Sequence, residues 1–246
     1  MIALRASRYQ PGDRIEVNGT PVRLRVDRRA HRISLRLDPA RREMIATAPS
    51  LRRLAEAAAF AEQRAAWMAD LLAKLPDDEP LVAGGTIDIL GRRCRLLRVE
   101  GRHSPGVVEH GGELVLKAAG DGTAFSRAAV RALKAYALKV LAERTAEHAA
   151  ALHVALPEVK VMDARSRWGS CRPPRGHHVG CVRYSWRLVL APWHVMDYVA
   201  AHEVAHLVRA DHSPHFWAEV RRLVKDDKPA RAWLRAHGQR LHAVGR

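Results

Sequence analysis

The stretch VAAHEVAHLVRADHSPHFW, residues 199–217, decides how the rest of the chain is interpreted. It contains the pattern His-Glu-x-x-His, formed by His202, Glu203 and His206. On an α-helix the two histidines lie one turn apart on the same face, so two imidazoles can bind one ion. Glu203 then lies beside the metal rather than on it, where a general base takes a proton from water.

The residues around this motif favour a helix that ends soon after the second histidine. Apolar residues recur at helical spacing on both sides of it, and Pro192 suits a first-turn position. Pro214 can open a new helix, so we expect the chain to turn back between the two helices. Because catalytic zinc sites usually take three protein ligands, His212 is the expected third ligand, with His215 as the alternative.

The composition favours a soluble, cytoplasmic protein. No apolar run reaches the length of a membrane helix, and the N-terminus lacks the apolar region of a signal peptide. The three cysteines are expected to be reduced thiols. The formal net charge of +16 allows a weak association with nucleic acid. The basic residues are spread along the chain, however, without the interleaved aromatics of a base-stacking surface.

Residues 1–122 are expected to form a β-rich N-terminal region with one long helix. Apolar and basic residues alternate between residues 15 and 49, which predicts an antiparallel sheet with a turn at residues 28–31. Ser50 can cap a helix from Leu51 to about Leu75. Glycines separate two further hairpins between residues 86 and 117, which we expect to extend the first sheet or half-close it into a barrel.

Residues 123–246 are expected to form the catalytic domain, after a linker at residues 120–122. The helical period returns from Ala124 to about Ala151 and is followed by a strand at 159–162. A strand over residues 178–190 then leads directly into the metal helix. Two further helices, on either side of residues 226–229, are expected to cover the metal helix and hold His212. The fold class is therefore α+β.

A hairpin before the metal helix is the best candidate for contacting substrate. Its first strand contains Trp168, Gly169 and Ser170, and its turn is Pro173-Pro174-Arg175-Gly176. An edge strand in this position can bind an extended peptide by strand addition. The alternative is that Trp168 and Trp186 are core residues.

Four segments of the second half resemble the YgjP-like metallopeptidases, relatives of the SprT-like zinc proteases. They are Arg167–Cys171, Asp197–Val199, His202–Leu207 and His212–Trp217. The resemblance implies a compact zincin-like, minigluzincin-like core, with Zn²⁺ on His202, His206 and His212 and Glu203 as catalytic base. It also implies that the Trp-Gly-Ser-Cys strand borders the cleft. Asp211 departs from the family pattern, which prefers Asn, and is either a carboxylate that orients His212 or a turn residue.

The leading hypothesis is a zinc-dependent hydrolase that cleaves peptide bonds in a polypeptide substrate. His215, Tyr184 and Arg187 are the candidates for stabilising the oxyanion. A second hypothesis keeps the metal but takes a nucleotide substrate, such as a nucleoside triphosphate or another phosphoanhydride, although no phosphate-cradling glycine loop is visible. A third is a DNA-associated module with a structural zinc, for which Glu203 would be dispensable.

Overall fold

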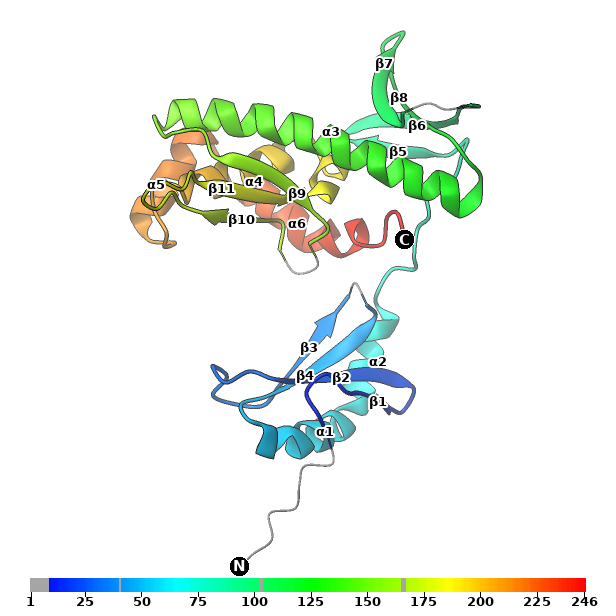
Figure 1. Cartoon of the computed structure of the whole chain (residues 1–246), viewed down its shortest axis with the longest axis vertical. Coiled ribbons are helices and arrows are strands. Elements are labelled where there is room, and N and C mark those ends of the chain that lie inside the picture. Colours follow the sequence, from blue (N-terminus) through cyan, green and yellow to red (C-terminus); the bar gives the residue numbers. More distant parts are fainter. Residues whose placement is uncertain (1–8, 40, 102–103, 165–166) are drawn as a thin grey trace, which may run out of the picture. The chain divides into compact units, whose positions relative to one another are not determined.

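The computed structural model describes residues 9–39, 41–101, 104–164 and 167–246 (Figure 1). These residues form a mixed α+β structure, which confirms the expected fold class. Contacts between residues divide the chain into two compact units, Met1–Asp77 and Asp78–Arg246. Each unit has its own hydrophobic core and is described by itself.

The first unit contains a four-stranded mixed sheet with strand order β1-β2-β4-β3. Its strands are β1 (Arg14–Val17), β2 (Thr20–Val26), β3 (Ser34–Asp38) and β4 (Glu43–Ala48). The prediction of a purely antiparallel sheet is wrong, because β2 and β4 pair in parallel and β3 lies outside β4. The reason is burial: nearly every residue of β4 is buried, and a strand covered on both faces belongs in the middle of a sheet.

The helical segment of the first unit is divided into three pieces. They are a 3₁₀ turn (Leu51–Arg53), α1 (Leu54–Gln63) and α2 (Ala65–Ala73), in place of the single helix expected up to Leu75. Arg64 breaks the helix with φ −110°. Ser50 precedes the first turn, but its side chain makes no capping hydrogen bond. The bend keeps Ala61 and Met68 fully buried against the sheet, so both helices contribute to one core.

The second unit begins with a separate four-stranded sheet of order β5-β6-β8-β7. Its strands are β5 (Thr86–Ile89), β6 (Arg92–Arg98), β7 (Gly106–His110) and β8 (Glu113–Ala118). The two hairpins therefore do not extend the first sheet as expected. Their apolar residues, such as Leu96 and Leu116, pack with Phe125 of α3 (Gly122–Ala151). For this reason the compact units separate at residues 77 and 78, whereas the sequence analysis placed the boundary at residue 122.

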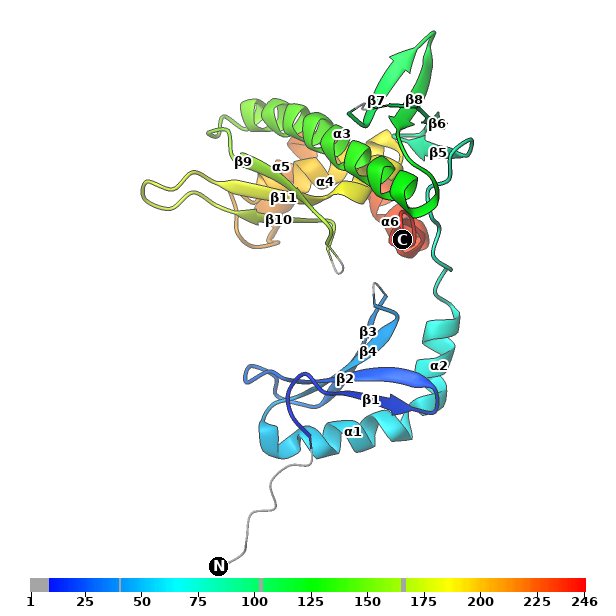
Figure 2. The ribbon, with the colours of Figure 1, turned by 45° about the vertical axis from the view of Figure 1, so that its right-hand side comes forward.

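A three-stranded sheet lies alongside α3 (Figures 1 and 2). Its strands are β9 (Glu158–Met162), β10 (Gly169–Arg172) and β11 (Cys181–Ser185), in the order β10-β11-β9, so β10 is an edge strand. β11 is shorter than the strand expected over residues 178–190. The residues that follow, Trp186–Leu190, form a buried 3₁₀ helix that packs on α3. Because this segment is buried on all sides, its sequence shows no alternation of apolar and polar residues that would distinguish a helix from a strand.

Three helices complete the second unit: α4 (Trp193–Ala205), α5 (Pro214–Leu223) and α6 (Lys228–Leu241). α4 is central, because it contacts α3, α5, α6 and strand β10. Pro192 precedes the first residue of α4, and Pro214 opens α5 as expected. None of the helices within the described part of the chain has the length and apolar character needed to cross a bilayer.

Candidate active site

Buried polar contacts hold α4 on the long helix α3. Asp197 of α4 accepts a hydrogen bond of 2.7 Å from His148 Nε2 and a further one from Arg144. Burial raises the pKa of Asp197, but the interactions with His148 and Arg144 together lower it below the usual value. The negative charge of Asp197 is therefore retained inside the unit, where it fixes the start of the helix that carries the histidines.

His202, His206 and His212 come together at the end of α4. One ring nitrogen from each of the three imidazoles lies within 4.8 Å of the others. His202 Nε2 and His212 Nε2 are 3.3 Å apart. Two nitrogens bound at about 2.0–2.1 Å to one tetrahedral zinc ion are separated by about 3.3 Å. The three imidazoles therefore fit a shared metal ion.

The surroundings of His202 and His206 keep these two imidazoles neutral. Burial lowers the pKa of His202 to about 4, and the neighbouring His206 and His212 add to this effect. Burial also lowers the pKa of His206. The Nδ1–H of His206 donates a 2.9 Å hydrogen bond to the carbonyl oxygen of Arg209. The other ring nitrogen, Nε2, is then left with a lone pair for an ion.

Phe216 of α5 contacts all three histidines. Its ring centroid lies 4.9 Å from that of His202, 4.4 Å from that of His206 and 4.9 Å from that of His212. The ring is fully buried. It therefore restricts the rotation of each imidazole, a role that the sequence analysis missed when it assigned this residue to a covering helix.

The turn between α4 and α5 distinguishes the two candidates for the third ligand. His212 lies in the cluster, whereas His215 is exposed on the first turn of α5 and is not part of it. Asp211 Oδ1 accepts hydrogen bonds from the backbone N–H and the hydroxyl of Ser213, at 3.3 and 2.8 Å. Asp211 thus stabilises the turn before α5, and it forms no hydrogen bond with the His212 ring within the described chain.

Glu203 lies flat against the backbone of strand β10. An added Cβ at Gly169 would lie 2.4 Å from Glu203 Oε1 and 2.5 Å from its Cγ, so only a glycine leaves room for this carboxylate. Glu203 is 6% exposed. Burial raises its pKa to about 7, and the nearby Arg167 acts in the opposite direction. A carboxyl group of this kind can both take up and release a proton near neutral pH.

Two pockets adjoin along β10, with Arg167, Gly169, His202 and Glu203 lining both. The histidine-lined pocket, of 350 Å³, also contains His206 and His212. The arginine-lined pocket, of 370 Å³, lies on the other side of Glu203. Its remaining lining residues are Trp168, Tyr198, Val199, Arg231, Leu234 and Arg235. Together the two pockets form a cleft that follows the edge strand.

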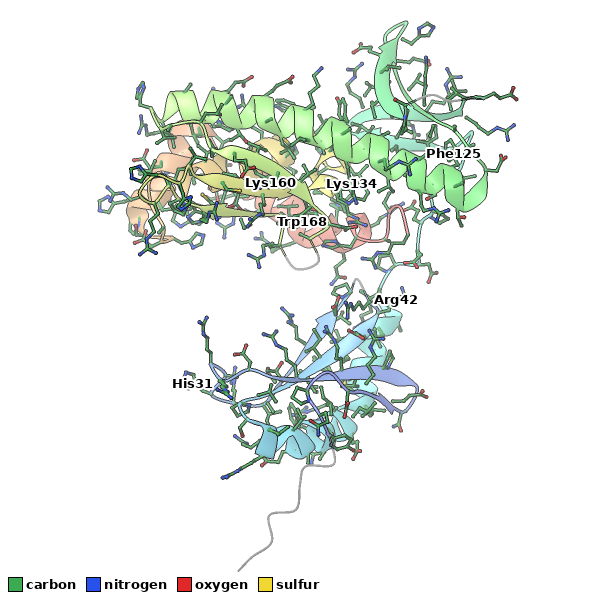
Figure 3. All side chains as sticks on the ribbon, in the orientation of Figure 1. His31, Arg42, Phe125, Lys134, Lys160 and Trp168 are labelled. Carbon is green, nitrogen blue, oxygen red and sulfur yellow. The ribbon has the colours of Figure 1, made fainter. Side chains whose placement is uncertain are left out.

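Three of the predicted substrate contacts line this cleft. Gly169 lies at its centre, Trp168 lines the arginine-lined pocket and Ser170 the histidine-lined pocket. Trp168, which is labelled in Figure 3, is also packed against the C-terminal part of the chain. Its ring stacks on His242 at 4.8 Å between centroids, and an added Cβ at Gly238 of α6 would lie 3.0 Å from it. Trp168 therefore serves both the cleft and the core.

Tyr184 and Arg187, predicted as oxyanion or substrate contacts, line neither pocket. Tyr184 is fully buried, and its hydroxyl lies 2.9 Å from that of Thr145 on α3. Arg187 is 2% exposed and pairs with Asp163. Both polar groups already have partners inside the unit, so they are not available to a substrate.

Several residues of the cleft were missed in the sequence. Arg231, Leu234 and Arg235 occupy positions i, i+3 and i+4 of α6 and so share one face, a spacing that could have revealed them. Cys171 lines the histidine-lined pocket, but burial raises the pKa of its thiol to about 12, with Glu203 and Cys181 adding to the effect. Cys171 is not among the three residues whose donor atoms cluster in the described structure, so the candidate metal site consists of imidazoles.

Comparison with known proteins gives one match. The model of the family described as YgjP-like, metallopeptidase domain, matches residues 31–237, which is most of the chain. No curated protein and no solved structure matches the chain. The family implies a metal-dependent hydrolase with a polypeptide substrate and a metal that is typically zinc. With its three clustered histidines and a buried glutamate on one cleft, this chain belongs to the YgjP-like metallopeptidase family.

Proposed function

We propose that the protein is a zinc metallopeptidase in which Glu203 is the general base. The observation that carries this proposal is the position of Glu203: its carboxylate lies in the same cleft as the three histidines and has a pKa of about 7. The second unit then corresponds to a zincin-like core, with the active-site helix packed below an edge strand.

His202, His206 and His212 would hold the metal. Their donor set of three imidazoles suits zinc, and fewer than four protein ligands is typical of catalytic sites. A bound divalent ion supplies Lewis acidity, which lowers the pKa of water and polarises a carbonyl group. Phe216 keeps the three rings in place for this task.

Glu203 would transfer the protons of the reaction. It accepts a proton from the attacking water and later donates it to the leaving amine, so the carboxylate is regenerated in each cycle. Both transfers are easiest for a group whose pKa lies near the working pH. Gly169 contributes by allowing the carboxylate to lie against β10, which fixes the distance between the base and the cleft.

Strand β10 would bind the polypeptide. One side of β10 pairs with β11, and its other side has no partner strand within the described parts of the chain. An extended peptide can add to such an edge through backbone hydrogen bonds, which are independent of its sequence. A peptide bound in this way would lie beside Glu203, which supports a peptide over a compact substrate.

Hydrolysis of a phosphoanhydride is the second candidate, because Arg167, Arg231 and Arg235 also suit phosphate groups.

One experiment separates the peptidase from the phosphoanhydride hydrolase. The purified, zinc-loaded protein is assayed for peptide release from an unfolded protein and for phosphate release from nucleoside triphosphates, each with Glu203→Gln as the comparison. We expect proteolysis that is lost in the variant while bound zinc is retained. Proteolysis that is unaffected by the substitution would refute the proposal, and phosphate release alone would favour the second candidate.

A further inference from the structure

The arginine-lined pocket carries a positive charge for which the proposed reaction has no use. Arg167, Arg231 and Arg235 line it, and Glu203 is the one acidic residue among its lining residues in the described structure. Activating water requires the histidines and the glutamate, which the neighbouring pocket already contains. A group of cations on one side of the cleft instead indicates that something anionic is bound there.

Arg231 is held in place at the wall of this pocket. Its guanidinium lies 5.1 Å from the centroid of the Trp217 ring and donates a 3.0 Å hydrogen bond to Asp227. Trp217 in turn packs against Phe216, the ring that contacts the three histidines. The cation is therefore preorganised relative to the metal site, and little side-chain entropy remains to be lost on binding.

The two other arginines of the pocket form no ion pair within the described chain. Arg235, one turn after Arg231 on α6, is exposed and has no ion pair or hydrogen bond with any described residue. Arg167 acts on the charge of Glu203 but forms no ion pair within the described chain. Trp168, Val199 and Leu234 add apolar groups to the walls of the pocket, which Gly169, Tyr198 and His202 complete. Cations and apolar groups in one pocket suit an anionic group on a short aliphatic stem.

We propose that the arginine-lined pocket binds a carboxylate of the peptide substrate, close to the bond that is cleaved. This inference rests on the proposed peptidase function and adds a preference for acidic substrates. The carboxylate can come from a glutamate or aspartate side chain or from the C-terminus of the peptide, since guanidinium groups bind both in the same bidentate way. The apolar walls and the adjacent free edge of β10 favour a peptide carboxylate over a phosphate.

The first test uses a set of quenched fluorescent peptides with the wild-type, zinc-loaded protein. The peptides share one sequence and an amidated C-terminus, and carry Glu, Gln or Lys at one position on either side of the cleavage site. A further peptide has only neutral side chains and a free C-terminal acid. We expect kcat/KM to be roughly tenfold higher for a carboxylate than for its amide, from one charge-assisted contact. The mass of the products identifies the position, and the two arms distinguish the side chain from the C-terminus.

The second test reverses one charge of the pocket. Arg235→Glu is the cleanest variant, because Arg231 has structural partners and Arg167 lies beside Glu203. We expect the ratio of kcat/KM for the carboxylate and amide peptides to fall roughly tenfold, to about one, and the Lys peptide to improve relative to the Gln peptide. The matched control is Arg221→Glu, an exposed arginine of α5 that lines neither pocket and has no ion pair within the described chain. Its ratio should equal that of the wild type.

A binding measurement keeps this proposal separate from the peptidase proposal. Fluorescence anisotropy of labelled, uncleaved peptides is measured with the Glu203→Gln protein, in which cleavage is blocked. We expect the carboxylate peptide to bind roughly tenfold more tightly than the amide peptide. We also expect this difference to be lost in the double variant with Arg235→Glu. This result supports carboxylate binding in the arginine-lined pocket even if no peptide is hydrolysed. Equal binding of the Glu, Gln and free-acid peptides, or a preference that Arg235→Glu leaves unchanged, overturns it while proteolysis and its dependence on Glu203 still stand.

Discussion

Each compact unit contains a buried glutamate, and the two are treated in opposite ways. Glu43 on β4 is 3% exposed and Glu203 on α4 is 6% exposed. Three arginines surround Glu43, the closest being Arg23 at 2.8 Å. Glu203 has only the opposing influence of Arg167, and burial raises its pKa to about 7. The two glutamates are therefore similarly buried but differ in their charged neighbours.

The difference shows that partners, more than burial, decide what a buried carboxyl group does. A carboxylate that is surrounded by arginines contributes ion pairs to the fold, and these are costly to disturb. A carboxyl group that is buried without such ion pairs is poised to exchange a proton. We expect substitutions at the two glutamates to separate catalysis from stability.

The largest effect is expected for Glu203→Gln. Loss of the general base should lower kcat/KM by roughly 10²–10⁴-fold, while the free energy of unfolding should not fall, because an amide is easier to bury than a carboxylate. Steady-state kinetics and urea unfolding of the same preparation measure both. A large loss of stability would mean that this glutamate is also structural, and the contrast with Glu43 would disappear.

Glu43→Gln should give the opposite result. Removing the carboxylate leaves three arginines without their counterion and should lower the stability of the first unit by about 3 kcal/mol, near the low end for a buried ion pair because Arg23 is partly exposed. Hydrogen exchange followed by mass spectrometry should show faster exchange in β2 and β4, with α4 as the internal control. The activity per folded molecule should stay the same.

Gly169→Ala tests whether the position of Glu203 matters as much as its chemistry. Its new Cβ would overlap the carboxylate and displace it, which should lower kcat/KM by roughly tenfold to a hundredfold. Gly106→Ala in β7 is the matched control, because no heavy atom lies within 4 Å of its added Cβ. Similar rates for the two variants would remove the contact with Gly169 from the explanation.

The smallest effect concerns His242, which is buried like Glu203 but lies outside the proposed reaction. Burial lowers its pKa to about 4; Arg187 and Arg246 lower it further, and Asp163 acts in the opposite direction. Between pH 6.5 and 4 the unfolded chain binds a proton that the folded chain excludes, so stability present at pH 7 is lost as the pH falls. Between pH 7 and pH 5, the free energy of unfolding of His242→Phe should therefore fall by about 1–2 kcal/mol less than that of the wild type. Urea unfolding at both pH values, with zinc in excess, measures the difference, and parallel pH profiles would exclude this histidine as the cause.

Local patterns predicted the elements of the site. Helical spacing indicates that His202 and His206 share one face, and the turn before Pro214 indicates that His212 returns to them; the structure brings the three together. The long helix α3 also follows from its period. The family is confirmed by its matching model. The role of each residue as ligand or base stays a prediction.

Features that depend on distant parts of the chain could not be predicted. The parallel pairs β2 with β4 and β6 with β8 join segments whose periodicity says nothing about their neighbours. Tyr184 was expected at the cleft because it is polar, but Thr145, far away in the sequence, satisfies its hydroxyl inside the core. The requirement for glycine at position 169 follows only from the position of Glu203 on another element.

The stacking of Trp168 on His242 has a consequence for the order in which the protein becomes complete. Trp168 precedes His242 by roughly 70 residues, and His242 follows every residue of the cleft in the chain. At a synthesis rate of roughly 5–20 residues per second, the ribosome needs several seconds to pass from one to the other. During that interval the tryptophan wall of the cleft lacks its support, so a nascent chain that already contains Glu203 and the three histidines would still be an incomplete peptidase.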